Sequence, residues 1–209
     1  MLSVRQVSKR LALRPVLRDA SFEAGGGEVI ALTGANGAGK STLLRIVAGV
    51  LLADAGDVIV VGDSMQQDRT KALAHVGYAP EHADVPEFLR GREWLSLVAS
   101  LKRAEWSDRE DDAGPLGTSQ FVHQRVGSLS LGQRRRLTLR AARLGNPKLL
   151  LLDEPTNGLD AAALTGIAEL FTSHAAGGGT VLFATHDAGF ARDVGARLLR
   201  VADGGVTAG

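Results

Sequence analysis

The sequence predicts an α/β fold in which a core of parallel strands carries an amino-terminal antiparallel β subdomain and an inserted α-helical subdomain. Short strands fill the first third of the chain, strand patterns disappear from about residue 83 to residue 144, and buried apolar strands resume at residue 149. We therefore expect one domain over residues 1–209, with the core in 1–82 and 145–209 and the helical subdomain in 83–144.

The first third of the chain reads as sheet followed by one helix. Turns rich in Gly, Asp and Arg separate four expected strands, at residues 2–7, 20–23, 29–32 and 58–61. A helix is expected to begin at Lys40 or Ser41, because apolar residues follow at helical spacing and Gly49 offers a stop.

The rest of the chain predicts helices and then buried strands. Residues 88–102 have a helical pattern, residues 107–120 are polar and rich in turn formers, and a second helix follows Ser130. The continuous apolar runs 149–152 and 181–184 are typical of parallel strands that are covered on both faces.

The composition is that of a folded domain and argues against several functions. The 209 residues are 44% hydrophobic and 22% charged, and the absence of cysteine excludes disulfides and Cys-ligated metal sites. A net charge of +1 gives no support to nucleic-acid binding. No apolar run approaches the roughly 20 residues of a spanning helix, and no signal region is evident. We expect a cytoplasmic chain that reaches a membrane only through a partner.

One segment matches the phosphate-binding pattern GxxxxGK[ST] between a predicted strand and a predicted helix. Its residues are Gly34, Ala35, Asn36, Gly37, Ala38, Gly39, Lys40 and Ser41, and we add the following Thr42 to the expected nucleotide contacts. Glycines let successive N–H groups converge on an anion, Lys40 can reach the β- and γ-phosphates of ATP, and the Ser41 hydroxyl can bind Mg²⁺. The alternative is a Gly-rich hairpin with a solvated lysine, which the flanking elements disfavour.

Two adjacent carboxylates end a buried strand in the segment KLLLLDE. Open α/β sheets place their ligands at the carboxyl ends of strands. Asp153 is therefore expected to hold Mg²⁺, and Glu154 to orient and polarise an attacking water. The alternative is a solvated strand end.

His186 follows the apolar strand 180–185 and is expected at the same edge of the sheet, where it can contact the γ-phosphate. Alone, such a histidine is more often a turn residue, with Thr185 or Asp187 capping the next helix. The accompanying motifs favour the phosphate contact.

The segment LSLGQ, residues 129–133, decides between families. In isolation it could be an ordinary Ser-capped helix start. In chain order, however, the sequence carries the phosphate-binding loop, residues 78–81 at the place of a Q-loop, LSLGQ, the strand LLLLDEP, residues 158–160 at the place of a D-loop, and His186. This order covers nearly the whole chain and resembles the nucleotide-binding domain of ABC transporters. The resemblance implies that the core has the P-loop NTPase (RecA-like) fold.

The resemblance implies a head-to-tail dimer, formed with a second copy or a homologous ATPase subunit, that closes around two Mg-ATP. Each ATP would lie between the phosphate-binding loop of one subunit and Ser130, Gly132 and Gln133 of the other. Asp160 would link the two sites, and Glu81, Glu154 and His186 would serve hydrolysis. The resemblance also implies a separate transmembrane subunit, with the chain on the inner face of the cell membrane.

The chain departs from the family at three places. The region that usually supplies an aromatic residue for adenine stacking offers Leu11 and Leu13, so base selectivity is expected to be weak. Glu81 stands where glutamine is commonest, and Leu131 replaces the middle glycine of the signature. Both variants resemble ATPase subunits of exporters for drugs, antibiotics and haem, which favours export. The run of arginines at 134–136 is expected to be a solvated helix face.

The segment after Glu81 is where the family receives a short helix of the membrane subunit. Its apolar residues are Val85, Phe88, Leu89, Trp94 and Leu95. Leu89 and Leu95 are expected in the core of the helical subdomain, while Phe88 and Trp94 are expected to face a partner.

Two other functions compete. Soluble ABC-type ATPases outside transport carry two cassettes in one chain or a long coiled coil within the site, and neither pattern is seen here. A P-loop kinase for small molecules would lack LSLGQ and His186. The first of these stays the alternative.

Overall fold

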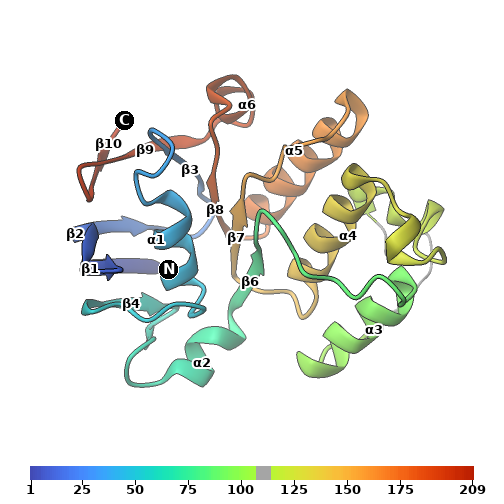
Figure 1. The fold of residues 1–209 in the computed structure, drawn as a ribbon, viewed down its shortest axis with the longest axis horizontal. Coiled ribbons are helices and arrows are strands. Elements are labelled where there is room, and N and C mark those ends of the chain that lie inside the picture. The colour runs from blue at the N-terminus through green and yellow to red at the C-terminus, as the bar shows by residue number, and fades with distance from the viewer. Residues whose placement is uncertain (107–113) are drawn as a thin grey trace.

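The computed structural model describes residues 1–106 and 114–209. They form an antiparallel sheet, a mainly parallel sheet and a group of helices at the far side of the second sheet (Figure 1). The α/β class, with an antiparallel β subdomain and a helical subdomain around a P-loop NTPase core, is confirmed. The proposed boundaries at residues 82/83 and 144/145 stay predictions.

The antiparallel sheet holds the first strands of the chain. Its order is β2-β1-β4-β5, with bounds β1 Leu2–Leu11, β2 Arg14–Ala24, β4 Ala55–Val60 and β5 Asp63–Ser64. The expected strands at residues 2–7, 20–23 and 58–61 all belong to it. The first two are longer than expected, because they pair along a hairpin that reaches from Leu2 opposite Ala24 to Leu11 opposite Arg14.

The second sheet carries the parallel strands. Its order is β10-β9-β3-β8-β7-β6, with bounds β3 Val29–Thr33, β6 Val76–Ala79, β7 Leu149–Asp153, β8 Thr180–Ala184, β9 Arg197–Ala202 and β10 Gly205–Ala208. β9, β3, β8, β7 and β6 are parallel neighbours, and β10 is antiparallel to β9. The carboxyl ends of β3, β6, β7 and β8 consequently meet at one edge.

Two of the three expected helices begin where the sequence predicts them. Their bounds are α1 Lys40–Val47, α2 Arg69–Ala74, α3 Gly91–Leu101, α4 Leu131–Arg143, α5 Ala161–Ala176 and α6 Ala188–Asp193, with 3-10 turns η2 Gly114–Leu116, η3 Thr118–Gln120 and η4 Val126–Ser128. The helix starts predicted at Lys40 and after Ser130 are confirmed, and α2 and α5 were not predicted. α3 begins three residues later than the expected residue 88, because the Glu93 carboxylate accepts the Arg90 N–H at 2.8 Å and fixes the start there.

The parallel sheet is covered on both faces, as its continuous apolar strands predict. Leu149 and Leu151 of β7 pack with α1 and the antiparallel sheet, whereas Leu150 and Leu152 pack with α5 and α4. The period of two along a strand produces this division. A third, smaller apolar cluster lies among α3, α4 and the 3-10 turns and includes Leu95, Phe121 and Leu137.

No helix in the described ranges, 1–106 and 114–209, has both the length and the apolar character that a membrane span requires.

Candidate functional site

The loop from β3 to α1 forms a cradle of backbone groups. Gly34, Gly37 and Gly39 have φ values of 143°, 79° and 106°, a region that favours glycine. A Cβ at Gly34 would also lie 2.3 Å from the Val201 carbonyl oxygen. The Lys40 Nζ donates to the carbonyl oxygens of Gly34 at 2.8 Å and Ala35 at 3.2 Å, so its ammonium lies over the loop. This geometry suits an anion that is bound by the backbone N–H groups of the loop together with the Lys40 ammonium.

Ser41 and Asp153 meet across the site. The Ser41 Oγ donates to Asp153 Oδ1 at 3.0 Å, which joins the first turn of α1 to the end of β7. Burial raises the pKa of Asp153 and the charge of Glu81 adds to this, whereas the Ser41 hydrogen bond, Arg45 and Arg135 oppose it. A hydroxyl beside a buried carboxylate supplies the oxygen ligands that Mg²⁺ prefers, so these residues fit that ion.

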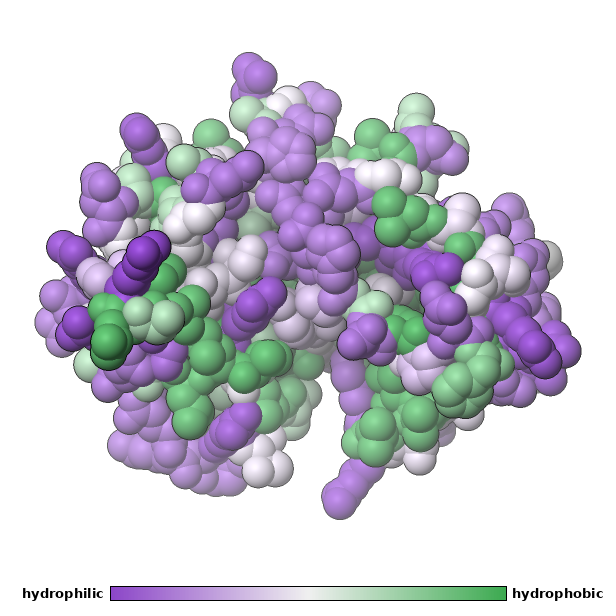
Figure 2. All heavy atoms as spheres, in the orientation of Figure 1, coloured by the Kyte–Doolittle hydropathy of each residue, from purple (hydrophilic) through white to green (hydrophobic). Residues whose placement is uncertain are grey.

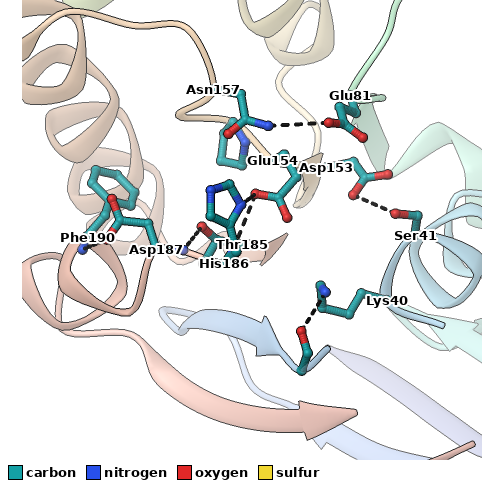
Figure 3. A network of polar contacts seen from close by, with 12 residues as sticks. Lys40, Ser41, Glu81, Asp153, Glu154, Asn157, Thr185, His186, Asp187 and Phe190 are labelled. Carbon is teal, nitrogen blue, oxygen red and sulfur yellow. Dashed lines mark hydrogen bonds and ion pairs between the residues drawn. The ribbon is translucent and has the colours of Figure 1, made fainter. Parts of the chain in front are cut away.

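Glu154 and His186 form a second pair, at the ends of β7 and β8. The imidazole Nδ1 lies 2.9 Å from Glu154 Oε2, and the Glu154 side chain is 12% exposed against 64% for His186. Glu154 adopts a φ of 49°, which is rare for a residue with a side chain, and its N–H donates to the Ala184 carbonyl oxygen at 2.9 Å. The backbone of Glu154, held against β8 in this conformation, thus directs its carboxylate toward the imidazole ring of His186 (Figure 3).

Glu81 reaches the site from the loop after β6. Its Oε1 accepts a hydrogen bond from Asn157 Nδ2 at 3.3 Å (Figure 3). Asn157 was not among the predicted site residues, and its position three residues after Glu154, in the loop before α5, is the only sequence signal that could have suggested it.

These groups surround an open cavity of about 570 Å³. Its lining combines the loop, the carboxylates and two aliphatic residues: Leu11, Val16, Asn36, Gly37, Gly39, Lys40, Ser41, Thr42, Glu81, Glu154, Asn157 and His186. The polar groups lie around Lys40, while Leu11 and Val16 are the only purely hydrocarbon side chains in that lining. This arrangement fits a polyanion joined to a flat apolar group, which is the chemistry of a nucleoside triphosphate.

The signature residues do not line this cavity. Ser130 caps α4: its Oγ accepts the Gln133 N–H at 3.2 Å, while Gln133 Oε1 accepts the Ser130 N–H at 2.9 Å. Leu131 between them is 69% exposed. Asp160 caps α5 by accepting the Ala163 N–H at 2.8 Å. The structure therefore brings together Lys40, Ser41, Glu81, Asp153, Glu154 and His186, and leaves Ser130, Gly132, Gln133 and Asp160 outside the cavity.

The prediction of a solvated arginine face is wrong for Arg135. Arg135 is 6% exposed, and its side chain donates to the main-chain carbonyl oxygens of Glu81 and Asp153. Arg134 and Arg136 are only partly exposed. Arg135 points inward because α4 packs against the ends of β6 and β7.

Comparison with known families decides the class. The sequence profile of the ABC transporter family matches residues 17–157, which include the loop, Asp153, Glu154 and the signature segment. The chain belongs to the ABC transporter family. It is an ATP-binding domain of that family, and domains of this kind are ATPases.

Similar proteins serve different kinds of transport. The ABC transporter ATP-binding protein YhcH of Bacillus subtilis is 36% identical over 80% of this chain and 55% of its own length. The cytochrome c biogenesis ATP-binding export protein CcmA of Aliivibrio fischeri is 35% identical over 89% of this chain and 92% of its own. The aliphatic sulfonates import ATP-binding protein SsuB of Cupriavidus necator is 34% identical over 97% of this chain and 66% of its own. The ABC domain thus spans little more than half of YhcH.

Solved structures agree with this placement. An ATP binding subunit of an ABC transporter superposes with a TM-score of 0.90 at 27% identity, covering 100% of this chain and 88% of that one. A dimeric bacterial ABC transporter cassette superposes with a TM-score of 0.84 at 25% identity, covering 99% of this chain and 96% of that one.

Proposed function

We propose that two copies of this ABC domain, or one copy and a homologous subunit, close head-to-tail around two ATP molecules and hydrolyse them to drive transport. One observation carries the proposal. The cavity holds the phosphate loop and the carboxylates, whereas Ser130 and the exposed Leu131 lie outside it and present the start of α4 to solvent. A second subunit can supply that helix start to the open side of the cavity. The existence of a dimeric relative supports this.

Within each site the residues have separable tasks. The loop N–H groups and Lys40 hold the β- and γ-phosphates, and Ser41 with Asp153 holds Mg²⁺. When bound, that ion neutralises charge that develops on the phosphates. Glu154 accepts a proton from the water that attacks the γ-phosphorus, while the bond from that phosphorus to ADP breaks. His186, in contact with Glu154, fixes the carboxylate and can donate to the γ-phosphate.

We further propose that the domain acts on a separate membrane subunit. The surface is hollowed beside the helices, with apolar residues on both sides of the hollow (Figure 2). Phe88 is 74% exposed, and Leu97 and Leu101 on α3 are 50% and 77% exposed. Trp94, expected to face a partner, is instead half-buried against the cluster that contains Leu95. Exposed apolar side chains of this kind are typical of a partner-binding surface.

For the direction of transport we propose export. Glu81 in the loop after β6 and Leu131 in the signature are the two residues that support it. Relatives whose names specify import and export are both similar to this chain, so whole-cell and inverted-vesicle transport assays of the purified complex are the measurement that distinguishes the two directions. Accumulation of cargo inside inverted vesicles on addition of ATP is the expected result.

Engineered cysteines test the head-to-tail dimer, because the chain has no cysteine of its own. Asn36 in the loop and Leu131 in the signature are both exposed, so Asn36→Cys/Leu131→Cys should give disulfide-linked dimers when ATP is added and hydrolysis is slowed. The matched control is Asn36→Cys/Leu101→Cys, whose second cysteine lies on α3 and should not cross-link. Equal cross-linking of both pairs, or of neither, contradicts the proposed arrangement.

A further inference from the structure

Arg135 joins three parts of the site through one side chain. It lies on α4, five residues after Ser130, and its hydrogen bonds to the described residues, 1–106 and 114–209, go to backbone carbonyl oxygens. Nη1 donates to Pro80 and, at 3.2 Å, to Glu81, both in the loop after β6. Nη2 donates to Asp153 at the end of β7, and Nε donates to Pro155 at 3.4 Å.

These acceptors belong to two segments that carry the hydrolytic residues. Pro80 and Glu81 follow β6, Asp153 and Pro155 flank Glu154, and β6 and β7 are adjacent parallel strands. The guanidinium therefore lies under the two loops that present Glu81 and Glu154 to the cavity, and it connects both to the signature helix.

Only arginine can make this set of contacts. Its planar fork has five N–H donors on three nitrogens, which can address carbonyl groups in different directions at once. A lysine ammonium has three donors on a single atom and leaves part of the set unpaired. Buried carbonyl groups that lose their donor shift toward other donors or admit water, and the loops that hold them move.

Charge adds to the geometry. Burial lowers the pKa of Arg135, and the carboxylates of Asp153, Glu81 and Glu154 act in the opposite direction. The guanidinium is thus a buried counter-charge to three carboxylates at the site as well as a donor to its backbone.

We propose that Arg135 is a positioning residue for ATP hydrolysis, which holds the loops that carry Glu81 and Glu154 in register with the signature helix. It touches none of the reacting atoms and acts through the two loops. The inference rests on the proposed function of the site and assigns a role to a residue that lies outside the cavity.

This role predicts a specific kinetic result. The phosphate loop lies between β3 and α1, whereas the hydrogen bonds of Arg135 go to the loop after β6 and to the end of β7, so nucleotide binding should be retained. Misplacement of a catalytic group by about 1 Å can cost on the order of 100-fold in rate, so Arg135→Met should lower kcat by that order while KM stays near wild type. Arg135→Lys keeps the charge and part of the contacts, and its kcat should lie between those of wild type and Arg135→Met.

Arg136 is the matched control. It is the next residue of the same helix, but its Nη1 contacts the Leu116 carbonyl oxygen at 3.4 Å and its guanidinium lies 4.8 Å from the Phe121 ring centre, so its contacts stay among the helices. Arg136→Met should therefore keep wild-type kcat at temperatures well below its melting point. The measurements are thermal melts, the Kd of a non-hydrolysable ATP analogue, and kcat and KM.

Amide hydrogen exchange without nucleotide gives a second readout that needs no ATPase activity. Residues 80–82 and 153–157 should exchange faster in Arg135→Met and Arg135→Lys than in wild type or Arg136→Met. If Arg135→Met does not fold, Arg135→Lys alone decides. Wild-type kcat and wild-type exchange in either stable Arg135 variant overturn the proposal. Absence of ATPase activity in wild type overturns the proposed function instead, and the exchange data then decide whether Arg135 holds the two loops.

Discussion

Ser41 and Asp153 are 112 residues apart in the sequence, yet a 3.0 Å hydrogen bond joins their side chains. The first turn of α1 and the last residue of β7 are thereby fixed relative to each other, beside the cavity that Ser41 and Lys40 line. Two oxygen ligands held side by side in this way form part of a cation site before any cation binds.

Ser41→Ala should weaken the use of Mg²⁺ more than the binding of nucleotide. The substitution removes one oxygen ligand and leaves Lys40 and the loop N–H groups in place. We expect a higher Mg²⁺ concentration at half-maximal hydrolysis, measured by titration at fixed ATP. Ser41→Thr keeps the hydroxyl and serves as the control. A wild-type Mg²⁺ titration for the alanine variant would remove Ser41 from the cation site.

Glu154→Gln should bind ATP but hydrolyse it slowly. The amide cannot accept the proton of the attacking water, and a positioned general base typically contributes about 10² to 10⁴ in rate. Trapped ATP should also lengthen the life of the dimer, which size-exclusion chromatography with ATP can detect. Glu169→Gln, an exposed change on α5, is the control. Retention of full activity by Glu154→Gln would exclude Glu154 as the base.

Leu11→Tyr should tighten ATP binding and sharpen base preference. Leu11 lines the cavity and is 41% exposed, and an aromatic ring there could stack on the base. Stacking of a base on an aromatic side chain is worth about 1–3 kcal/mol, or roughly 5- to 150-fold in Kd. Leu13→Tyr is the control, since Leu13 is 84% exposed and lies outside the lining. Wild type should use ATP and GTP with similar KM. A strong ATP preference in wild type would show that another group reads the base.

Phe88→Ala and Leu95→Ala should separate partner binding from folding. Phe88 is 74% exposed, so its loss should leave the melting temperature unchanged and weaken association with a membrane subunit by about 2 kcal/mol, roughly thirtyfold. Leu95 is fully buried, and its truncation should cost about 2–5 kcal/mol of unfolding free energy. Pull-downs and thermal melts of both variants provide the measurements. Wild-type partner binding by Phe88→Ala would place the docking surface elsewhere.

Glu28 should contribute stability that is lost at low pH. Burial alone would raise its pKa, but the Gly25 N–H and the Arg197 guanidinium, 2.7 Å away, outweigh that effect, and the pKa falls below its ordinary value of 4.5. A carboxylate with a lowered folded-state pKa stabilises the fold above its unfolded pKa and loses this contribution as pH falls through the folded one. Because the pair is partly exposed, Glu28→Gln should cost at most about 1 kcal/mol at pH 7. Melts from pH 7 to pH 3 should show the two proteins converge below pH 4.5. A gap that does not shrink as the pH falls below 4.5 would mean that Glu28 acts by packing.

The sequence alone was sufficient for the parts of the site that local patterns encode. The helix start at Lys40 and the buried strand before Asp153 have strong periodic signals, and both are confirmed. β6 was not predicted, because four residues that include Gly77 and Tyr78 carry too little pattern and become a strand through pairing with β7.

Arg135 shows a different limit of local reasoning. Three consecutive arginines are typical of a solvated face, and this pattern hid the position of the middle one. Arg135, Leu139 and Ala142 share one face of α4 by helical spacing, and the last two are buried against the sheet. That spacing was the available signal. Two of the carbonyl groups that stabilise the buried guanidinium belong to residues more than 50 positions away, and no local pattern reveals them.

The order β3-β8-β7 has a consequence for how the protein is made on the ribosome. β8 is synthesised after both of its neighbours and lies between them, so a nascent chain that ends before residue 180 has β3 and β7 with no common partner strand. The ends of these strands carry the phosphate loop and the paired carboxylates. The emerging polypeptide can therefore acquire its ligand-binding edge only after β8 has been synthesised, and chaperones that protect exposed strand edges would be needed most between the synthesis of β7 and that of β8.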